Sequence, residues 1–467
     1  MVERVDVGGG AAGLGGGAGG RRRRNAGLGG IGEARPAIST RAIRTRWGPL
    51  HRDARFTRAT EGTLSTALCR KEDFHYGVYV SRRPGTPSLL RSINDRNALE
   101  LLLHDGPLTR VELSKRTGLS KVTASQLLSR LQERDLVEVV GTRSARRGPS
   151  AELYAIRPDC SYSIGIEMDP HHVRASLADI TGAVVSHVER EVEGTGDPKQ
   201  LIHDTAADVA SQGEIELTKV DEVVIGMPGV VDPVSGDIEL SFDLPGWHRG
   251  LRHTLAADLG ARVSFENDVN LAASAERAEG AGRDVDNMVL LWVGRGVGLA
   301  IVLGGDVHHG ATGAAGEIGY LPVPGVPSPA NIERPAQGAL QALVGASAVL
   351  ELSREHGIVA DGAPQAVRAA LAGGAAAEGF LRELADRVAL GLAAVCAVVD
   401  PAVVVVAGET GAAGGDELCA RIADAVPHIA PVHPKVVPTG IDDSPILRGA
   451  VLAAVDKARQ AIIISAE

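Results

Sequence analysis

Cysteine is scarce in this chain, and so are aromatic residues and long apolar runs. The four cysteines are scattered singly along 467 residues, so they form neither a CxxC metal knuckle nor a disulfide framework. No run of about 18 or more uncharged apolar residues occurs, and the Gly- and Arg-rich start lacks the apolar segment of a secretory signal. We therefore expect a cytoplasmic protein with reduced thiols.

Glycine and aliphatic residues are, by contrast, abundant. The chain has 58 glycines and 44% hydrophobic residues, whereas aromatic residues make up only 3%. Glycine-rich turns between aliphatic segments favour an α/β fold. A length of 467 residues suits two or three domains and allows a large core.

Charge is distributed unevenly along the chain. The formal net charge is −10, but residues 1–88 carry about +9 and residues 89–158 about +4, which leaves about −23 for the rest. Because nucleic acids attract basic surfaces, we expect any contact with them near the N-terminus.

Residues 1–83 are predicted to form a disordered Gly/Arg-rich extension. The first part of it consists mainly of Gly, Ala and Arg, which cannot bury enough apolar surface to offset the entropy of ordering the chain. The run Arg21–Arg24 is interpreted as a solvated tail in preference to a phosphate contact. A misassigned upstream start codon is an alternative explanation, with the functional chain beginning near Val78 or Val80.

Two helical segments follow this extension. Apolar residues recur at helical spacing from Ser88 until Gly106 and the proline after it end the run. Thr109 and Glu112 have the spacing of a capping box, which predicts a short second helix that ends at Gly118. A short glycine turn to a third helix would complete a helix-turn-helix motif.

The third helix is expected to run from Lys121 to about Arg134, capped by Ser120. In a helix-turn-helix this helix lies in the major groove of DNA, and its first residues meet base edges. The predicted base contacts are Ser120, Lys121, Thr123, Ser125 and Gln126. The opposite, packing face is expected to hold Val122, Leu127, Leu128 and Leu131, and Arg130 is placed at a DNA phosphate.

A basic hairpin follows the helix-turn-helix. Strands are predicted over 136–140 and 152–156, joined by the segment GTRSARRGPS. Arg146 and Arg147 in this segment suit a narrow minor groove or the phosphates beside it. A solvated loop, or a packing module that binds protein, are the alternatives. Together with the local positive charge, the pattern favours a winged helix that binds double-stranded DNA.

Strands and helices alternate after Tyr162, as in α/β proteins. The expected strands are 162–168, 173–179, 222–226, 262–265, 288–293, 297–303 and 402–407, and the expected helices are 198–211, 249–259, 268–279 and 380–399.

The chain from about Pro84 to Asp456 resembles the ROK family, which joins bacterial sugar kinases with winged-helix repressors of sugar metabolism. The resemblance rests on the helix-turn-helix and on the segments PGVVD (228–232), DLPGW (243–247), END (266–268) and GAAGEIG (313–319). It implies a winged helix-turn-helix over 84–157, followed over 158–467 by the two-lobed, actin-like (ribonuclease H-like) sugar-kinase fold acting as a sensor domain.

The phosphate loops depart from the pattern of the kinases in this family. Their first loop has the pattern GxDxGGT, where this chain has GIEMDPH over 165–171. Asp169 would repel phosphate, Pro170 has no N–H to donate, and His171 replaces the threonine. The second loop, 294–298, keeps its glycines but has Arg295 for threonine. We therefore expect no ATP, no cofactor and no kinase activity, although Arg295 offers an alternative contact for a phosphorylated sugar.

The sugar side matches the family better. The resemblance implies sugar contacts from Asn267, Asp268, Glu317 and Tyr320, the last in place of the family's histidine. Without ATP, Asp268 would be a vestigial catalytic base that accepts a hydrogen bond from the sugar. The alternative is that Asn267 and Asp268 only cap the helix that follows.

No zinc site is expected. The family's zinc-binding histidine is replaced at Tyr320, and its cysteine run is absent from 323–345. His308 and His309 are interpreted as surface residues.

The sequence thus predicts a transcription regulator, a repressor that binds an operator as a homodimer or homotetramer and responds to a sugar or sugar derivative bound between the lobes. Two rival interpretations stay open: an active sugar kinase with a DNA-binding domain, and a regulator whose second domain serves only dimerisation.

Overall fold

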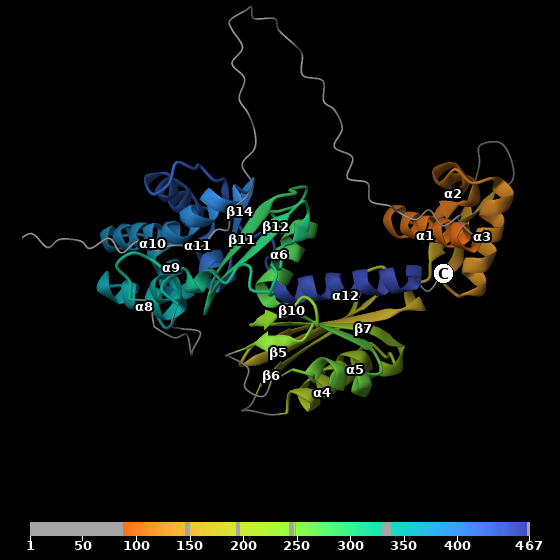
Figure 1. Cartoon of the computed structure of the whole chain (residues 1–467), viewed down its shortest axis with the longest axis horizontal. Helices are drawn as coiled ribbons and strands as arrows, with labels where there is room; N and C mark the ends of the chain where they lie inside the picture. The colour runs from red at the N-terminus through yellow and green to blue at the C-terminus, as the bar shows by residue number, and fades with distance from the viewer. Residues whose placement is uncertain are drawn as a thin grey trace, which may run out of the picture. The chain divides into compact units, whose positions relative to one another are not determined.

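Two five-stranded sheets and a smaller three-stranded sheet organise the described part of the chain (Figure 1). The computed structural model describes residues 87–144, 150–192, 197–241, 247, 249–327 and 338–464, and all of them belong to one unit that begins at Ser81. The predicted extension 1–83, Arg21–Arg24 within it, most of the DLPGW segment, and Arg146 and Arg147 lie outside these ranges.

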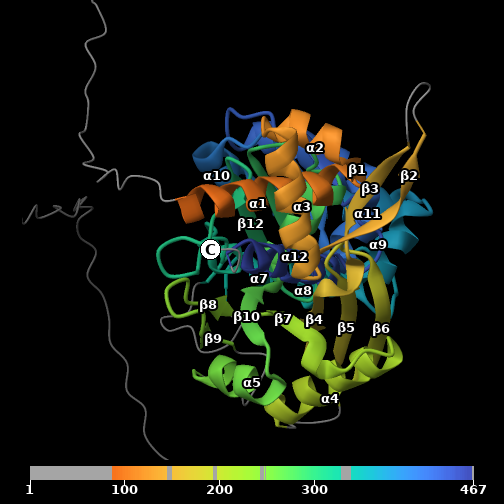
Figure 2. The same cartoon turned by 90° about the vertical axis from the view of Figure 1, so that its right-hand side faces the viewer.

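The N-terminal elements form a winged helix (Figure 2). They are α1 (Pro87–Asp105), β1 (Leu108–Thr109), α2 (Arg110–Thr117), α3 (Lys121–Glu133), β2 (Val137–Arg143) and β3 (Ala151–Ile156). The strands pair in the order β1-β3-β2. The predicted capping box of Thr109 and Glu112 is present, and Gly118 ends α2 in the left-handed conformation, at φ 72°. The helix-turn-helix prediction is confirmed, whereas β1 was not predicted.

The first large sheet has the order β10-β7-β4-β5-β6. Its strands are β4 (Tyr162–Met168), β5 (His172–Asp179), β6 (Val184–Glu191), β7 (Val220–Met227) and β10 (Arg262–Asn267). The pairs β10–β7 and β7–β4 are parallel, and β4–β5 and β5–β6 are antiparallel. Helices α4 (Pro198–Gln212) and α5 (Leu251–Leu259) cover one face of this sheet, and α12 (Pro445–Ile464) covers the other (Figure 1).

The second large sheet repeats this pairing scheme in the order β13-β12-β11-β14-β15. Its strands are β11 (Met288–Val293), β12 (Val297–Leu303), β13 (Asp306–Val307), β14 (Val403–Ala407) and β15 (Val436–Pro438). The pairs β11–β14 and β14–β15 are parallel, and β11–β12 and β12–β13 are antiparallel. Two sheets with one pairing scheme are what the predicted two-lobed, actin-like fold requires, so the fold class is confirmed.

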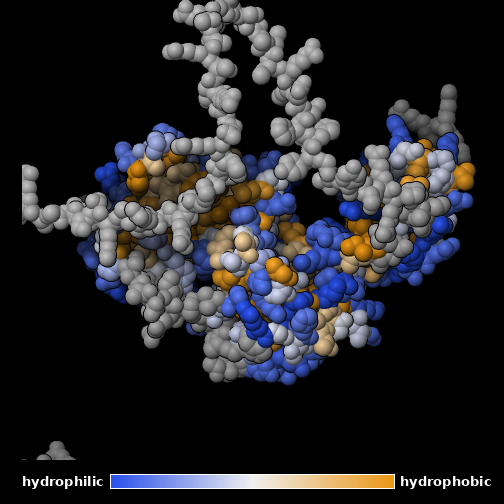
Figure 3. Space-filling model, in the orientation of Figure 1, coloured by the Kyte–Doolittle hydropathy of each residue, from blue (hydrophilic) through white to orange (hydrophobic). Residues whose placement is uncertain are grey.

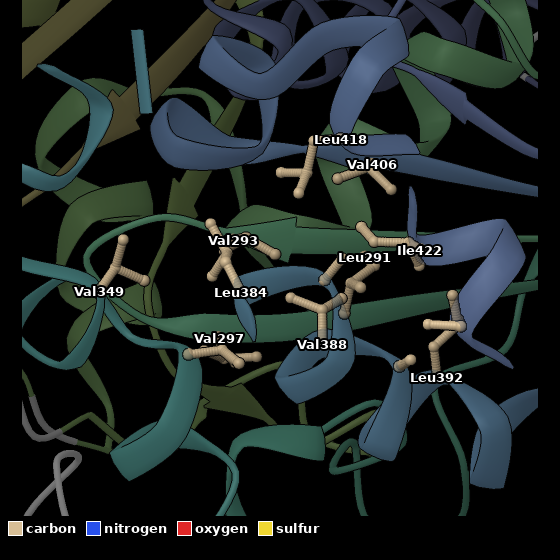
Figure 4. Packing of buried hydrophobic residues seen from close by; sticks show 14 of the residues in the cluster. Leu291, Val293, Val297, Val349, Leu384, Val388, Leu392, Val406, Leu418 and Ile422 are labelled. Atoms are coloured by element: carbon tan, nitrogen blue, oxygen red, sulfur yellow. The ribbon is translucent and has the colours of Figure 1, made fainter. Parts of the chain in front are cut away.

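Helices pack on both faces of the second sheet. One face contacts α6 (Asp268–Glu279), and the other contacts α11 (Gly408–Ala425), which packs on α9 (Ala363–Leu371) and α10 (Ala375–Val399). The short α7 (Gln341–Val344) and α8 (Ala346–Glu355) lie beside this group. Figure 4 shows Leu384, Val388 and Leu392 of α10 close to Leu291 and Val293 of β11. These interdigitating aliphatic side chains form the largest of the hydrophobic cores described.

Helices α6 and α12 pack closely against each other. A Cβ atom on Gly449 of α12 would lie 2.0 Å from the carbonyl oxygen of Leu271 in α6, and one on Gly165 of β4 would lie 2.4 Å from the backbone nitrogen of Val451. Only glycine allows backbones to approach this closely. The buried carboxylate of Glu276 in α6 binds the segment between β15 and α12, since it accepts hydrogen bonds from the backbone N–H groups of Gly440 and Ile441, at 2.9 and 3.2 Å.

Helix α12 also packs on the winged helix. Ala458 from α12 and Ile180, which follows β5, share a hydrophobic cluster with the winged-helix core. Arg459 donates hydrogen bonds to the carbonyl oxygens of Ile180 and Thr181, at 2.9 and 2.7 Å. A small apolar pocket lies at this junction, lined by Leu99, Leu103, Leu136, Ile156, Cys160, Ile180, Arg459, Ile462 and Ile463.

Several elements were missed by the sequence analysis, among them β6, β13, β15, α8, α9, α11 and α12. Strand β6 lies at a sheet edge and carries four charged or imidazole side chains, so it has no apolar run. Helix α12 packs on strands, on α6 and on α1, which removes the one-sided apolar stripe by which amphipathic helices are identified. None of the described helices is long and apolar enough to cross a membrane.

The surface of the described residues is largely hydrophilic. On the face drawn in Figure 3, most of the surface is hydrophilic, with apolar areas between the polar ones. Scattered apolar residues of this kind are normal for a protein surface.

Candidate functional site

The start of α3 is fixed by its own polar side chains. The Ser120 hydroxyl accepts a hydrogen bond from the backbone N–H of Thr123 at 3.1 Å and lies 2.8 Å from the Thr123 hydroxyl. Ser125 is half-buried and accepts a hydrogen bond from Arg110 of α2 at 3.3 Å. Three of the predicted base contacts therefore also have structural roles, whereas Lys121 and Gln126 are exposed.

Val122 was expected on the packing face, and this expectation was wrong. Its side chain is 68% exposed, whereas Ala124 is fully buried beside Leu127, Leu128 and Leu131. A helix turns by about 100° per residue, so residue 122 lies on the side opposite to residue 124. Val122 thus shares the exposed face of Lys121 and Gln126 and adds an apolar side chain to it.

Arg130 is paired within the winged helix. Its Nη2 atom lies 2.5 Å from Oδ1 of Asp95 in α1, and Asp95 is only 5% exposed. Removing either partner would leave a charge without its counterion in a partly buried place. Arg143 at the end of β2 is similarly paired with Glu112, at 2.6 Å. Both guanidinium groups hold the helices and the wing strand together, and the DNA contact of Arg130 stays a prediction.

The first loop, which faces phosphate in the kinases, is closed here by its own aspartate. Oδ1 of Asp169 accepts hydrogen bonds from the backbone N–H groups of His171 and His172, at 2.7 and 2.9 Å. These N–H groups are thereby satisfied within the loop. A phosphate group would have to displace a carboxylate of its own charge.

A glutamine side chain holds the second loop. Oε1 of Gln341 accepts a hydrogen bond from the backbone N–H of Val297 at 2.7 Å, and its Nε2 donates to the carbonyl oxygen of Arg295 at 3.2 Å. Gly294 lies against Glu409, whose Oε2 would be 2.0 Å from a Cβ at this position. Gly294 therefore allows close packing and does not by itself indicate a nucleotide.

Asn267 caps helix α6, as the alternative interpretation expected. Its Oδ1 accepts a hydrogen bond from the backbone N–H of Asn270 at 3.1 Å, and its Nδ2 donates to the carbonyl oxygen of Gly229 at 3.1 Å. Oδ1 of Asp268 accepts a hydrogen bond from the backbone N–H of Val269 at 2.8 Å. The amide and the carboxylate are thus fixed side by side at the point where β10 becomes α6.

Glu317 and Tyr320 follow in a loop that reaches this point from the second sheet. Glu317 begins the short turn η3 (Ile318–Tyr320), and its side chain is exposed. Desolvation by surrounding protein atoms and the negative charge of Asp268 raise the pKa of Glu317. Because the charge of Asp268 acts on Glu317, the two carboxyl groups lie near each other, as expected if both face one site. Tyr320 is half-buried.

Glu167 is a buried carboxyl group, and Asp268 in the same region is half-buried. Burial raises the pKa of Asp268 to about 6, although the hydrogen bond from Val269 and the positive charge of Arg295 oppose this shift. Burial also raises the pKa of Glu167 to about 7; Arg174 opposes the shift, and the charges of Asp169 and Asp268 add to it. Near neutral pH Glu167 is therefore partly protonated, whereas Asp268 is mostly charged.

Glu167 gives a testable pH dependence. Between the unfolded value of about 4.5 and the folded value of about 7, the folded protein binds more protons, so its free energy of unfolding falls as the pH rises through this window. Glu167→Gln should remove this fall. The difference in free energy of unfolding between the variant and the wild type should therefore be roughly 1–2 kcal/mol more favourable to the variant at pH 8 than at pH 5. Urea unfolding at both pH values measures it, with Glu189→Gln, the exposed partner of the same arginine, as control. Parallel pH profiles for wild type and Glu167→Gln would contradict the prediction.

One residue near Asn267 was missed by the sequence analysis. His309 was interpreted as a surface residue, but its side chain is half-buried and lies 2.9 Å from Glu266. No regular spacing in the sequence links these two residues. Among the described residues, no group of three His, Cys, Asp or Glu side chains is arranged to hold a metal ion.

A winged helix followed by two five-stranded sheets with the same pairing scheme defines a protein with a DNA-binding module and a sugar-kinase fold. Residues 93–148 match the MarR family, and residues 163–456 match the ROK family. Since the second match covers more than half of the chain, the protein belongs to the ROK family.

Individual relatives have low sequence identity. The "Xylose repressor" of Bacillus subtilis (strain 168) is 23% identical over 242 residues, which is 50% of this chain and 62% of that protein. The chain thus matches about three fifths of the length of this relative.

Two solved structures share the fold. A "ROK family transcriptional regulator, homolog of E.coli MLC protein" aligns with 81% of this chain and 98% of its own, with a TM-score of 0.66 and 19% identity. The ROK hexokinase from Thermus thermophilus aligns with 64% of this chain and 99% of its own, with a TM-score of 0.53 and 24% identity.

Proposed function

We propose that this protein is a DNA-binding transcription regulator, a repressor of carbohydrate genes whose ROK domain senses a sugar. The observation that carries the proposal is the exposed face of α3, where Lys121, Val122 and Gln126 project into solvent. The start of this helix is capped, and its opposite face is buried in the core of the winged helix. A lysine, an amide and a small apolar side chain can contact a phosphate, an adenine edge and a thymine methyl group respectively. The similarity to a repressor supports this assignment.

The second domain is proposed to bind a sugar or sugar derivative and to have no kinase activity. Asn267, Asp268, Glu317 and Tyr320 would supply donors and acceptors for sugar hydroxyl groups. The Asp169 carboxylate already occupies the N–H groups of the first loop. Three further acidic groups, Asp268, Glu317 and Glu409, are in this region against Arg295, so a neutral sugar is favoured over a phosphorylated one.

The partners follow from these sites. The DNA would be a double-stranded, pseudo-palindromic operator, bound by a homodimer or homotetramer because two winged helices must reach two half-sites. Arg146 and Arg147 are proposed to contact phosphates or the minor groove beside the α3 site. We also propose that the DNA-binding domain ends at residue 157 and that the protein is located in the cytoplasm.

Alanine substitutions in α3 test the proposed function. Lys121→Ala and Gln126→Ala should each weaken binding to a DNA fragment selected from genomic DNA by the wild-type protein, by roughly 5- to 30-fold, because each contact is worth about 1–2 kcal/mol. The two variants should keep the thermal stability of the wild type, since both side chains are exposed. Fluorescence anisotropy measures the affinities. Wild-type affinity in both variants, or ATP-dependent phosphorylation of hexoses that Asp268→Asn abolishes, would overturn the proposal.

A further inference from the structure

His309 and Glu266 form an ion pair between the two large sheets. Nε2 of His309, which follows β13 of the second sheet, lies 2.9 Å from Oε2 of Glu266 in β10 of the first sheet. The two side chains are 38% and 25% exposed. A short, partly buried bond between an imidazole and a carboxylate is stronger than an exposed ion pair.

The other oxygen of Glu266 fixes the turn that carries the predicted sugar contacts. Its Oε1 accepts hydrogen bonds from the backbone N–H of Asn267 at 2.9 Å and from Nδ2 of Asn270 at 3.0 Å. Asn270 is only 3% exposed, and its backbone N–H in turn binds the Asn267 side chain. The orientation of Asn267 and of its neighbour Asp268 therefore depends on where the Glu266 carboxylate is held.

The backbone of His309 is connected to the other half of the site. Its carbonyl oxygen accepts a hydrogen bond from the backbone N–H of Ala315 at 3.2 Å, two residues before Glu317. Gly316 packs against β12, where its carbonyl oxygen accepts a hydrogen bond from the N–H of Leu299 at 3.0 Å. A Cβ on Gly316 would lie 1.9 Å from the Leu299 carbonyl oxygen, so only glycine allows the loop to pack this closely on β12. His309 is thus mounted on the loop that carries Glu317.

We propose that His309 is a positioning residue of the sugar site, which holds the Asn267–Asp268 turn of one lobe in register with the Glu317 loop of the other. The inference rests on the proposed function, because it concerns the same sugar site. The protonated imidazole, paired with Glu266, is the form that keeps the two halves in register. Sugar should therefore bind more tightly while His309 is charged.

The charged groups around His309 set the direction of this dependence. The hydrogen bond that the His309 imidazolium donates to Glu266 in β10 raises the pKa of His309, whereas desolvation and the positive charge of Lys457 in α12 lower it, and the net shift is upward. A histidine with a raised pKa is charged below this pKa and neutral above it. The affinity for sugar should hence be full in mildly acidic solution and fall as the pH rises through the pKa of His309, above the ordinary value of 6.5.

The experiment compares two adjacent histidines in the full-length protein. D-Xylose, D-glucose and N-acetyl-D-glucosamine are titrated into wild type, His309→Gln and His308→Gln by isothermal calorimetry from pH 6 to pH 8.5. His308 is the matched control, since it is exposed and has the same chemistry. We expect His309→Gln to bind the best wild-type ligand about 10-fold more weakly at pH 6 and to lose the fall in affinity through the pKa of His309, whereas His308→Gln keeps the wild-type affinity and this fall.

A second variant separates positioning from loss of folding. Glu266→Gln keeps an amide oxygen that can accept the hydrogen bond from Asn267 N–H but removes the charge, so it too should flatten the pH profile. Equal affinity and an equal pH profile in wild type, His309→Gln and Glu266→Gln would overturn the inference while leaving a sugar sensor in place. If none of the three sugars binds the wild type at any pH, the proposed function fails and the inference with it.

Discussion

Gly449→Ala should destabilise the protein by about 3 kcal/mol or more. The new methyl group would lie 2.0 Å from the carbonyl oxygen of Leu271 and 2.5 Å from its carbonyl carbon. Both atoms belong to the backbone of α6, so no side-chain rotation can relieve the overlap. In an exposed helix the same substitution would stabilise by about 1 kcal/mol, because alanine is the better helix former. The sign of the effect therefore reports the contact between α6 and α12.

Urea unfolding followed by circular dichroism measures this effect. Gly296→Ala is the matched control, since a Cβ at Gly296 meets only the Gln341 side chain, at 4.0 Å, and its φ lies outside the left-handed region. The control should change the free energy of unfolding by less than about 1 kcal/mol. A Gly449→Ala protein as stable as the control would show that α12 does not pack on α6 as described.

Val122→Asp should reduce the affinity for the selected DNA fragment by roughly 100-fold or more, because a carboxylate on the exposed face of α3 would be placed against the phosphates and base edges of the groove. This is a larger loss than either alanine variant should give, since it adds repulsion as well as removing a contact. The fold should be unaffected, because the side chain is 68% exposed and packs on no core residue.

The effect of Val122→Asp is measured by fluorescence anisotropy at one fixed salt concentration, since affinity for DNA depends steeply on salt. Val234→Asp is its control, with the same change of charge at a 90% exposed valine of the second domain. We expect the control to bind DNA nearly as well as the wild type. Equal losses in the two variants would mean that net charge, and not the α3 face, determines the affinity.

The winged helix could be predicted from sequence because local rules specify it. The Thr109–Glu112 capping box, the Gly118 turn and the Ser120 cap each act over three or four residues, and all three are present in the structure. The position of Val122 could not be assigned in the same way. Whether Val122 is exposed depends on which face of α3 is buried, and the buried residue that decides this is Ala124. Alanine by itself gives little hydrophobic signal in the sequence.

The strands of both sheets were predicted largely because buried strands form continuous aliphatic runs. The pairing of His309 with Glu266 was beyond the sequence, since 43 residues separate them and only the folded sheets bring them together. The closing of the first loop by Asp169 could be predicted only in part. The loss of glycine was visible in the sequence, whereas the hydrogen bonds to His171 and His172 depend on the local turn.

The contacts of helix α12 link the affinity for a sugar to the affinity for DNA. Its first half packs on α6 beside the Asn267–Asp268 turn, and Ala458 in its second half belongs to the hydrophobic cluster of the winged helix. If a sugar changes the affinity for DNA through this helix, DNA must change the affinity for the sugar by the same factor, because binding free energies form a closed cycle. The operator is then an effector of the sugar site. If the sugar weakens binding to DNA, a protein already bound to its operator would need a higher sugar concentration for half-saturation than the free protein, and the ratio of the two concentrations would equal the loss of DNA affinity.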